Sequence, residues 1–143
     1  LCDRRQRQMC IRDSRYPDRV GLTIGFVPEL SKKIYAGADM FLMPSQSEPC
    51  GLAQMIALRY GTIPIVRETG GLRDSIHDAG DKSGNGFTFK SYNAHDMLDA
   101  VVRARAYYDD KMKWGRLVNT ALKQNFSWTK SAKDYIALYN DIH

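Results

Sequence analysis

Two short apolar runs, separated by a helix-like stretch, limit most strongly what this chain can fold into. Residues 39–44 read DMFLMP and residues 62–66 read TIPIV. Short continuous apolar runs are typical of strands that are buried on both faces, as in a parallel sheet. Between them, GLAQMIALRYG at 51–61 spaces its apolar residues as a helix does, and Gly61 suits the end of that helix. This order predicts a β-α-β unit with a right-handed crossover.

The remaining sequence continues the alternation of strands and helices. Asn93, followed by Asp96 three residues later, indicates the start of a helix. Further strands are predicted at 21–26 and 86–89, and further helices at 30–38, 72–78, 94–108, 111–124 and 129–142. The pattern predicts an α/β fold in which a parallel sheet lies between Rossmann-like layers of helices. Since a parallel sheet needs cover on both faces and four strands are few, we expect part of a larger doubly wound domain.

Composition excludes several classes of protein. The 143 residues fit one domain and contain no apolar run of membrane-spanning or signal-peptide length, so we expect neither a membrane protein nor a secreted one. Three cysteines, an odd number without metal-type spacing, predict a reducing, cytoplasmic compartment. The three histidines are scattered, so we expect no metal and no other cofactor.

The net charge of +5 has two interpretations. It describes either an ordinary basic surface or a surface that attracts an anionic ligand such as a nucleotide. No stripe of Lys and Arg is interleaved with aromatic residues, so nucleic-acid binding is not expected.

The first fourteen residues do not share the pattern of the rest. LCDRRQRQMCIRDS holds four arginines and two aspartates and has no apolar period. Residues 1–14 are therefore predicted to be a foreign or disordered tail, the alternative being a short arginine-rich surface helix. The predicted domain spans residues 15–143.

The predicted order of strands and helices indicates by itself where a ligand site lies. In an open parallel sheet, ligands bind beyond the carboxyl ends of the strands. The connections at 26–29, 44–51 and 67–71 leave those ends, so we expect them to lie close together. Gly51 is predicted to open a helix whose first turn, with unpaired N–H groups, suits a phosphate. Glu48 precedes it, where its carboxylate accepts hydrogen bonds from sugar hydroxyls or merely stabilises the helix N-terminus.

Other residues of these connections have a structural and a functional interpretation. Cys50 is either a reactive thiol or, as we favour, a small packed residue whose backbone matters more than its sulfur. Residues 69–71, Thr-Gly-Gly, predict a second flexible turn ahead of a helix. Arg67 and Glu68 are predicted to be a solvated pair rather than site residues.

Two strings carry a resemblance to a known family. PSQSEPCGLAQ at 44–54 and YGTIPIVRETGGLRD at 60–74 resemble the bacterial glycogen synthases and plant starch synthases that use ADP-glucose. The likeness runs from about residue 15 to the end and includes FSWTKSAKDYIALY at 126–139. Those enzymes are retaining glucosyltransferases with the two-domain GT-B fold. The resemblance implies that residues 15–143 are an incomplete C-terminal, nucleotide-sugar-binding domain of that fold.

The resemblance also implies roles for individual residues. Glu48 corresponds to the catalytic-site glutamate that holds or orients the transferred glucose. Phe26 lies where the family commonly has a tyrosine that stacks on adenine, and Ala53 replaces a hydroxyl residue of some members. Ile56 stands where many related transferases have a second glutamate, and it also suits a core position. The implied substrate-binding residues are Phe26, Cys50, Gly51, Leu52, Ala53, Thr69, Gly70 and Gly71.

The implied reaction transfers glucose from ADP-glucose to the 4-hydroxyl of an α-1,4-glucan with retention, and ADP leaves. In the family the acceptor is bound by an N-terminal domain that these residues do not include, so we expect the isolated chain to be inactive. Two alternatives stay open: a non-catalytic nucleotide-sugar-binding or interaction domain, and a GT-B transferase that uses a UDP-sugar. The apolar face of helix 129–142 is expected either to be exposed or on another copy, or to pack on its own domain.

Overall fold

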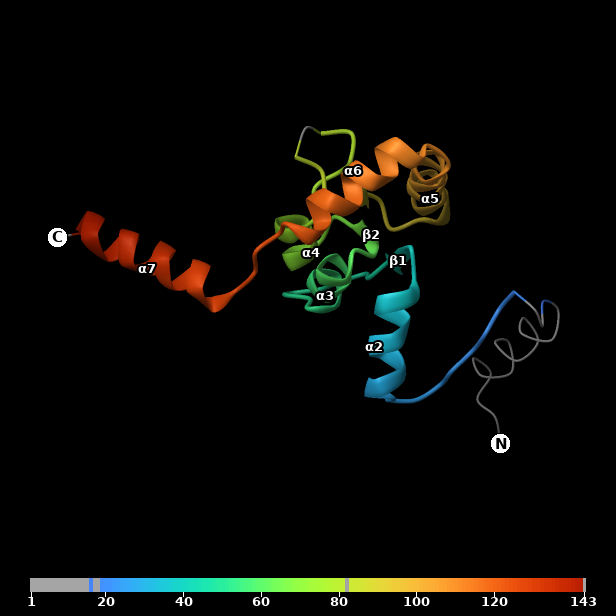
Figure 1. Ribbon diagram of the computed structural model, residues 1–143, viewed down its shortest axis with the longest axis horizontal. Coiled ribbons are helices and arrows are strands. Elements are labelled where there is room, and N and C mark those ends of the chain that lie inside the picture. Colours follow the sequence, from blue (N-terminus) through green and yellow to red (C-terminus); the bar gives the residue numbers. More distant parts are fainter. Residues whose placement is uncertain (1–15, 17–18, 82, 143) are drawn as a thin grey trace. The chain divides into compact units, whose positions relative to one another are not determined.

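The structure, a computed structural model, describes residue 16, residues 19–81 and residues 83–142. The chain divides into two units, Leu1–Leu30 and Ser31–His143, and the sheet belongs to the second (Figure 1). The predicted tail at 1–14 lies outside the described residues, so the proposed division into a tail and a domain from residue 15 stays a prediction.

Three parallel strands form the sheet, in the order β1-β2-β3. They are β1 (Met40–Met43), β2 (Ile63–Arg67) and β3 (Phe87–Phe89). Met43 pairs with Val66, and Arg67 pairs with Phe89, so the carboxyl ends of all three strands meet at one edge. The predicted parallel α/β arrangement is therefore confirmed.

Helices connect and cover these strands. Helix α3 (Ala53–Tyr60) links β1 to β2, and α4 (Gly70–Ser75) links β2 to β3. Gly61 ends α3 in a left-handed conformation, φ +79°, as predicted. Asn93 caps α5 as predicted, because its side-chain oxygen accepts the Asp96 N–H at 2.9 Å. The other helices are α2 (Pro28–Gly37), α5 (Ala94–Asp109), α6 (Lys111–Leu122) and α7 (Trp128–Ile142).

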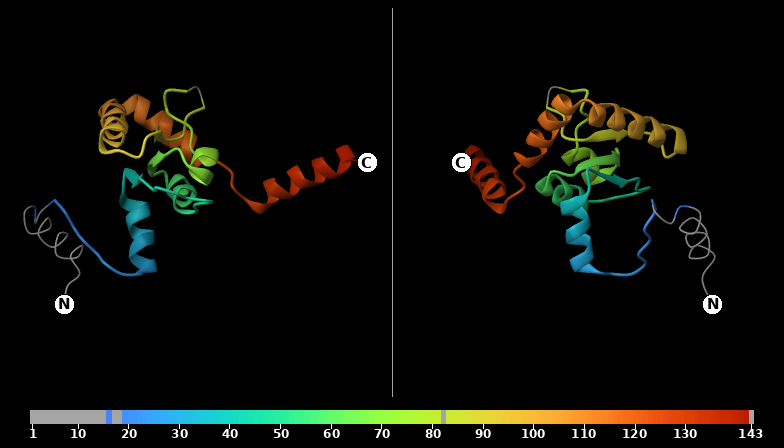
Figure 2. Two further views of the ribbon diagram at one scale, coloured as in Figure 1. Left: turned by 180° about the vertical axis from the view of Figure 1, so that it is seen from behind. Right: turned by 45° about the vertical axis from the view of Figure 1, so that its right-hand side comes forward.

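The core is centred on β2, whose first four residues are buried. Helix α5 packs on β3 and β2, and α6 packs on α5 and α3. Figures 1 and 2 show α5 on one side of the strands and α3 on the other, and α6 reaches both helices. This cover on both faces explains why TIPIV is uninterruptedly apolar.

Two strand predictions need correction. Residues 21–26 form no strand: Ile24 and Phe26 are 54% and 95% exposed, and Gly25 has φ +143°. Strand-forming residues become a strand only when a neighbouring strand supplies hydrogen bonds, and no described residue supplies them here. β1 is not buried on both faces as predicted, since it is the outer strand of the described sheet and Leu42 is 43% exposed.

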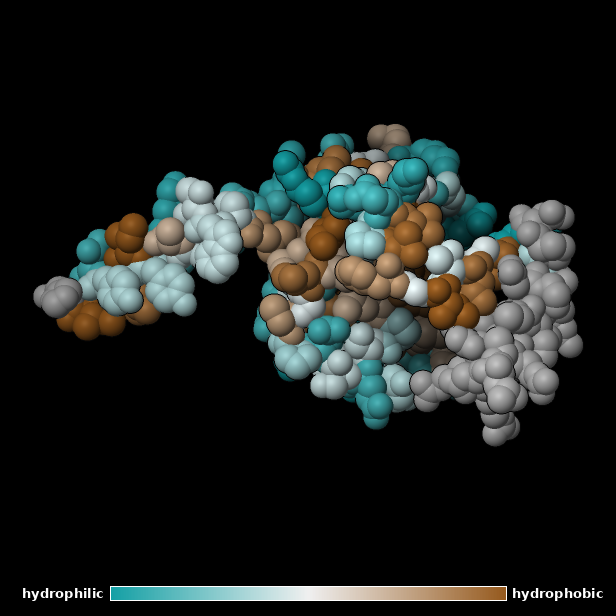
Figure 3. Space-filling model, turned by 90° about the horizontal axis from the view of Figure 1, so that it is seen from below, coloured by the Kyte–Doolittle hydropathy of each residue, from teal (hydrophilic) through white to brown (hydrophobic). Residues whose placement is uncertain are grey.

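Helix α7 buries none of its residues. Its large apolar residues are 52–89% exposed, with Tyr135, Ile136 and Tyr139 at 59–61%, and Figure 3 shows apolar surface along this helix. Of the two expectations for its apolar face, exposure is confirmed, and packing on its own domain is not found among the described residues.

Candidate functional site

The connection between β1 and α3 carries most of the predicted site residues. Residues 44–52 form an irregular loop between these two elements. Gly51 has φ +70°, a left-handed conformation that glycine adopts at low cost. The prediction that Gly51 opens the helix is wrong by two residues, because α3 begins at Ala53 with Leu52 as its N-cap. The left-handed residue instead turns the chain from the loop into the helix.

The start of α4 packs directly on this loop. Gly70 and Gly71, predicted to lie in a turn ahead of the helix, are the first two residues of α4, and Thr69 is its N-cap. The N–H of Gly71 donates to the carbonyl oxygen of Glu48 at 3.1 Å. A Cβ atom on Gly71 would overlap the carbonyl of Cys50, and one on Gly70 would overlap the carbonyl of Glu48. The close approach of two backbones explains why both positions are glycine. The predicted proximity of these two connections is confirmed.

Several polar groups of this junction have no hydrogen bond to a neighbouring element. The Glu48 side chain is half-buried, and its carboxylate has no hydrogen-bond or ion-pair partner among the described residues. It therefore makes no hydrogen bond to the first turn of α3, as the helix-stabilising interpretation would have suggested. Leu52 and Thr69, the N-caps of α3 and α4, make no side-chain cap hydrogen bond. A carboxylate and two uncapped helix starts thus gather at the carboxyl edge of the sheet.

Gln54 braces the junction from inside, a role that sequence reasoning missed. It is fully buried, and its Nε2 donates to the carbonyl of Gly51 at 2.8 Å, to that of Cys50 at 3.4 Å and to Ser75 Oγ at 3.1 Å. Ser75 Oγ in turn donates to the carbonyl of Gly71 at 2.6 Å. Gln54 Oε1 has no partner among the described residues. A polar residue among the apolar positions of α3 was the available signal.

The prediction that Arg67 and Glu68 form a solvated pair is wrong. Arg67 donates from Nη1 to the carbonyl of Gln46 at 2.6 Å and from Nε to that of Lys90 at 3.2 Å. Glu68 accepts from Thr88 Oγ1 at 2.8 Å. Both side chains are half-buried, and each is held by a different segment. Their opposite charges suggested a pair, but the backbone of β2 directs them to separate partners.

The residues around the start of α3 are more exposed than expected. The Cys50 thiol is free and exposed, so Cys50 is not a packed residue. Leu52 is 64% exposed and Ala53 is half-buried. Ile56 is 42% exposed and lines a groove of about 700 Å³ together with Met55 and Leu52, so it is not a core residue.

Phe26 belongs to the other unit, Leu1–Leu30. Its ring is 95% exposed, which leaves its face available for stacking. A place for Phe26 beside the other predicted residues stays a prediction. The fold brings together the rest of the predicted set, namely Glu48, Cys50, Gly51, Leu52, Ala53, Thr69, Gly70 and Gly71.

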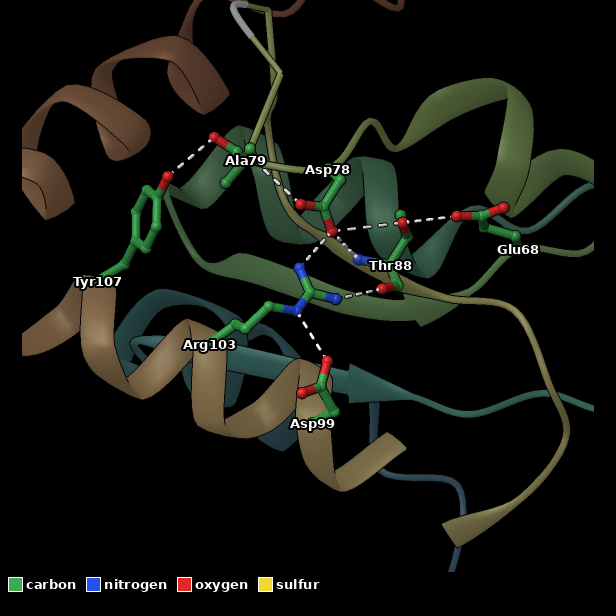
Figure 4. Close-up of polar contacts among 8 residues, drawn as sticks. Glu68, Asp78, Ala79, Thr88, Asp99, Arg103 and Tyr107 are labelled. Carbon is green, nitrogen blue, oxygen red and sulfur yellow. Dashed lines mark hydrogen bonds and ion pairs between the residues drawn. The ribbon is translucent and has the colours of Figure 1, made fainter. Parts of the chain in front are cut away.

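A polar network supports the junction from the side of β3 (Figure 4). Arg103 donates to Asp78 Oδ2 at 2.7 Å, to Asp99 Oδ2 at 3.0 Å and to the carbonyl of Thr88 at 2.7 Å. Burial by itself raises the pKa of Asp78, but hydrogen bonds from Arg103 and from the backbone N–H groups of Thr88 and Gly80 outweigh it and lower that pKa. Through the Thr88 hydroxyl the network reaches Glu68, next to the second turn of the site.

The described residues contain no group of three or more His, Cys, Asp or Glu side chains placed to hold a metal ion. None of the described helices combines the length and the apolar character that crossing a membrane requires.

Comparison with known proteins bears on this geometry. The family model of the group 1 glycosyl transferases matches residues 15–116. A glycogen synthase from Anoxybacillus flavithermus is 55% identical over 129 residues, 89% of this chain and 27% of that protein. One from Clostridioides difficile is 52% identical over 132 residues, 91% of this chain and 28% of that protein. The chain thus spans about a quarter of the length of these curated relatives.

Two solved structures are similar as well. The catalytic domain of starch synthase IV from Arabidopsis thaliana, bound to ADP and acarbose, has a TM-score of 0.82 at 42% identity, over 95% of this chain and 29% of that one. A sucrose-phosphate synthase from Thermosynechococcus elongatus has a TM-score of 0.65 at 23% identity, over 96% of this chain and 34% of that one, and shows the fold alone. The predicted GT-B fold class and the resemblance to glycogen and starch synthases are confirmed. Because the family match covers more than half of the chain, the chain belongs to the group 1 glycosyl transferases.

Proposed function

We propose that this chain is the nucleotide-sugar-binding part of a glycogen synthase that transfers glucose from ADP-glucose to the 4-hydroxyl of an α-1,4-glucan with retention. The observation that carries the proposal is the junction of loop 44–52 with residues 69–71, at the edge of the sheet where the strands end. There the Glu48 carboxylate has no hydrogen-bond or ion-pair partner among the described residues. The similarity to a starch synthase structure that holds ADP supports the choice of nucleotide.

In this proposal each residue acts on a different part of ADP-glucose. Glu48 accepts hydrogen bonds from the glucosyl hydroxyls and orients the sugar. The backbone N–H groups of Cys50 and Gly51 face the sugar, and those of Leu52 and Ala53, at the start of α3, face the phosphates. Phe26 stacks on adenine, and residues 69–71 line the pocket.

Glucosyl transfer requires that such a site stabilise the transition state and the departing ADP. The transition state of glucosyl transfer resembles an oxocarbenium ion, and ADP gains negative charge as it leaves. Helix N-termini and fixed N–H groups stabilise that charge without reorganising at the moment of reaction. The α-glucan acceptor is bound by an N-terminal domain outside these residues. We further propose a cytoplasmic protein that binds neither nucleic acid nor membrane.

The test is Glu48→Ala in a full-length glycogen synthase that carries this segment. We expect kcat for α-glucan extension to fall by about 10²–10³-fold, the range for removing one preorganised polar group, while the far-ultraviolet circular dichroism stays unchanged. Asp81→Ala, in the exposed turn before β3, is the matched control and should retain full activity.

Donor competition tests the alternatives in the same enzyme. ADP-glucose should support turnover and UDP-glucose should not. Turnover with UDP-glucose alone would identify a UDP-sugar transferase, and nucleotide binding without any transfer would identify a non-catalytic binding domain. Full activity of Glu48→Ala would contradict the assigned role of Glu48.

A further inference from the structure

Arg67 is a cation that forms no ion pair with any carboxylate of the described residues. It is the last residue of β2, at the edge of the sheet where the predicted site lies, and its side chain is half-buried. No acidic residue forms an ion pair with it in the part of the chain that the structure describes. Burying a charge partly without a counter-ion is unfavourable unless hydrogen bonds satisfy it, so the partners of Arg67 need an explanation.

Those partners are backbone carbonyls of two other segments. Nη1 lies 2.6 Å from the carbonyl oxygen of Gln46 and 3.5 Å from that of Ser45, in the loop after β1. Nε lies 3.2 Å from the carbonyl oxygen of Lys90, after β3. The guanidinium carbon also lies 5.5 Å from the centroid of the Tyr92 ring. One planar group thus ties the carboxyl ends of all three strands together.

The contact to Gln46 fixes the first half of the loop that carries Glu48. The second half is fixed independently, because Gln54 Nε2 donates to the carbonyl of Gly51 at 2.8 Å. Between these points, the Glu48 carbonyl accepts the N–H of Gly71 at 3.1 Å. The backbone of Glu48 therefore lies between two carbonyls that side chains hold. Arg67 holds the carbonyl on its N-terminal side, and Gln54 holds the one on its C-terminal side.

We propose that Arg67 is a positioning residue: its guanidinium holds the loop after β1, so that Glu48 keeps its position beside residues 69–71. For its effect on catalysis the proposal rests on the proposed function above, whereas its effect on the loop does not. The obvious alternative is that Arg67 binds a donor phosphate directly through its charge. The geometry favours positioning because Nε and Nη1 are both engaged with carbonyls.

Arg67→Lys separates geometry from charge. Lysine keeps the positive charge but is a point donor on a flexible stem and cannot reproduce the fork that reaches Gln46 and Lys90 together. Arg105→Lys is the matched control, since Arg105 on α5 is exposed and its one ion pair among the described residues is with Asp109. Arg67→Gln removes the charge while keeping one donor group.

The first measurement is amide hydrogen exchange in this chain, followed by NMR. The Gly71 N–H is protected by the Glu48 carbonyl, so a loosened loop exposes it. We expect the Gly71 N–H to exchange about tenfold faster in Arg67→Lys than in the unsubstituted chain, because the loop then loses one of the hydrogen bonds that hold it. The Gly61 N–H, bonded to Leu58 at the end of α3, should be unchanged and reports that the fold is intact. Equal Gly71 exchange in both proteins would overturn the proposal.

The second measurement is steady-state kinetics in the full-length enzyme. Since displacing a site by about 1 Å can cost on the order of 10²-fold in rate, we expect kcat of Arg67→Lys to fall at least about tenfold with a smaller change in KM for ADP-glucose. Arg105→Lys should match the unsubstituted enzyme. If Arg67→Lys retains kcat and Arg67→Gln raises KM, Arg67 is a charge for phosphate and the proposal is wrong. If the unsubstituted enzyme shows no glucosyl transfer, the proposed function fails, and hydrogen exchange still decides the role of Arg67.

Discussion

At the scale of single residues, the loop after β1 is held by its carbonyl oxygens rather than by its side chains. Five of them accept hydrogen bonds from Arg67, Gly71 or Gln54, whereas the Glu48 carboxylate has no partner among the described residues. A loop held in this way keeps its shape whatever its side chains bind, and this is the preorganisation that a polar site needs. The shortest of these hydrogen bonds run from Arg67 to Gln46, from Gln54 to Gly51 and from Gly71 to Glu48.

Replacing Gly71 by alanine tests how closely the two backbones approach. The added methyl group would overlap the carbonyl of Cys50, so the loop or the turn must move. We expect the free energy of unfolding to fall by about 1–3 kcal/mol, as for overpacked positions. Gly115→Ala is the control: nothing lies near its Cβ position on α6, and alanine should stabilise that helix by about 0.5–1 kcal/mol. Urea denaturation measures both. Equal stability of Gly71→Ala and the unsubstituted chain would show that the junction is loosely packed.

At the scale of elements, two amphipathic helices of similar pattern have different environments. Helix α6 buries Trp114, Leu117 and Ala121 against the core, whereas α7 buries nothing. The sequence pattern is equally clear in both, because spacing decides which residues share a face and not what covers that face. The same reasoning explains β1, whose apolar run is half-exposed at the outer edge of the described sheet.

The contrast between the two helices is measurable in this chain. Leu117→Ala on α6 should lower the free energy of unfolding by about 2–5 kcal/mol, because Leu117 is 6% exposed and the change leaves a cavity. Leu138→Ala on α7 should change it by no more than about 0.5 kcal/mol, because Leu138 is 52% exposed. Urea denaturation of both variants provides the comparison. A large loss for Leu138→Ala would mean that α7 packs against the core in solution.

At the scale of the whole molecule, one polar network joins the segment before β3, β3 itself and α5. Arg103 on α5 bonds to Asp78 and to the carbonyl of Thr88, and Tyr107 Oη donates to the carbonyl of Ala79 at 3.1 Å. These contacts hold together pieces of chain that are distant in sequence. They also make the stability of the molecule depend on pH.

The sign of that dependence follows from Asp78. Because the pKa of Asp78 is lowered in the folded state, its contribution is fully present above the unfolded value of roughly 3.9 and is lost as the pH falls through the folded value. Asp78→Asn should cost about 1–3 kcal/mol at pH 7, the range for hydrogen bonds to charged groups, and less below about pH 4. Urea titrations from pH 7 to pH 3 measure this. Asp109→Asn, in an exposed pair with Arg105, should show little effect at any pH. A difference for Asp78→Asn that does not vary with pH would contradict this role.

Most of the second unit could be predicted from local pattern. The strands at 39–44, 62–66 and 86–89, the stop at Gly61 and the cap at Asn93 are consequences of residue type and spacing. The strand at 21–26 could not be judged in this way, since a strand depends on a neighbour whose presence local sequence does not reveal.

The residues of the predicted site also fall into those that local sequence predicts and those that it does not. Glu48, Gly51 and the glycines at 70–71 follow from topology and glycine chemistry, because parallel strands end at one edge. Arg67 and Glu68 were misjudged because their hydrogen-bond partners lie about 20 residues or more away in the sequence. Gln54 was missed because one of its three partners, Ser75, lies on another helix, α4.

By itself, the sequence determined the order of strands and helices, the parallel sheet and the edge at which its strands end, because hydrophobic period and turn chemistry act over a few residues. Only the tertiary structure decided which carbonyls Arg67 and Gln54 hold, that the loop after β1 touches the start of α4, and that β1 and α7 stay exposed. Those outcomes depend on contacts between segments far apart in the chain, and such contacts follow from packing rather than from local pattern.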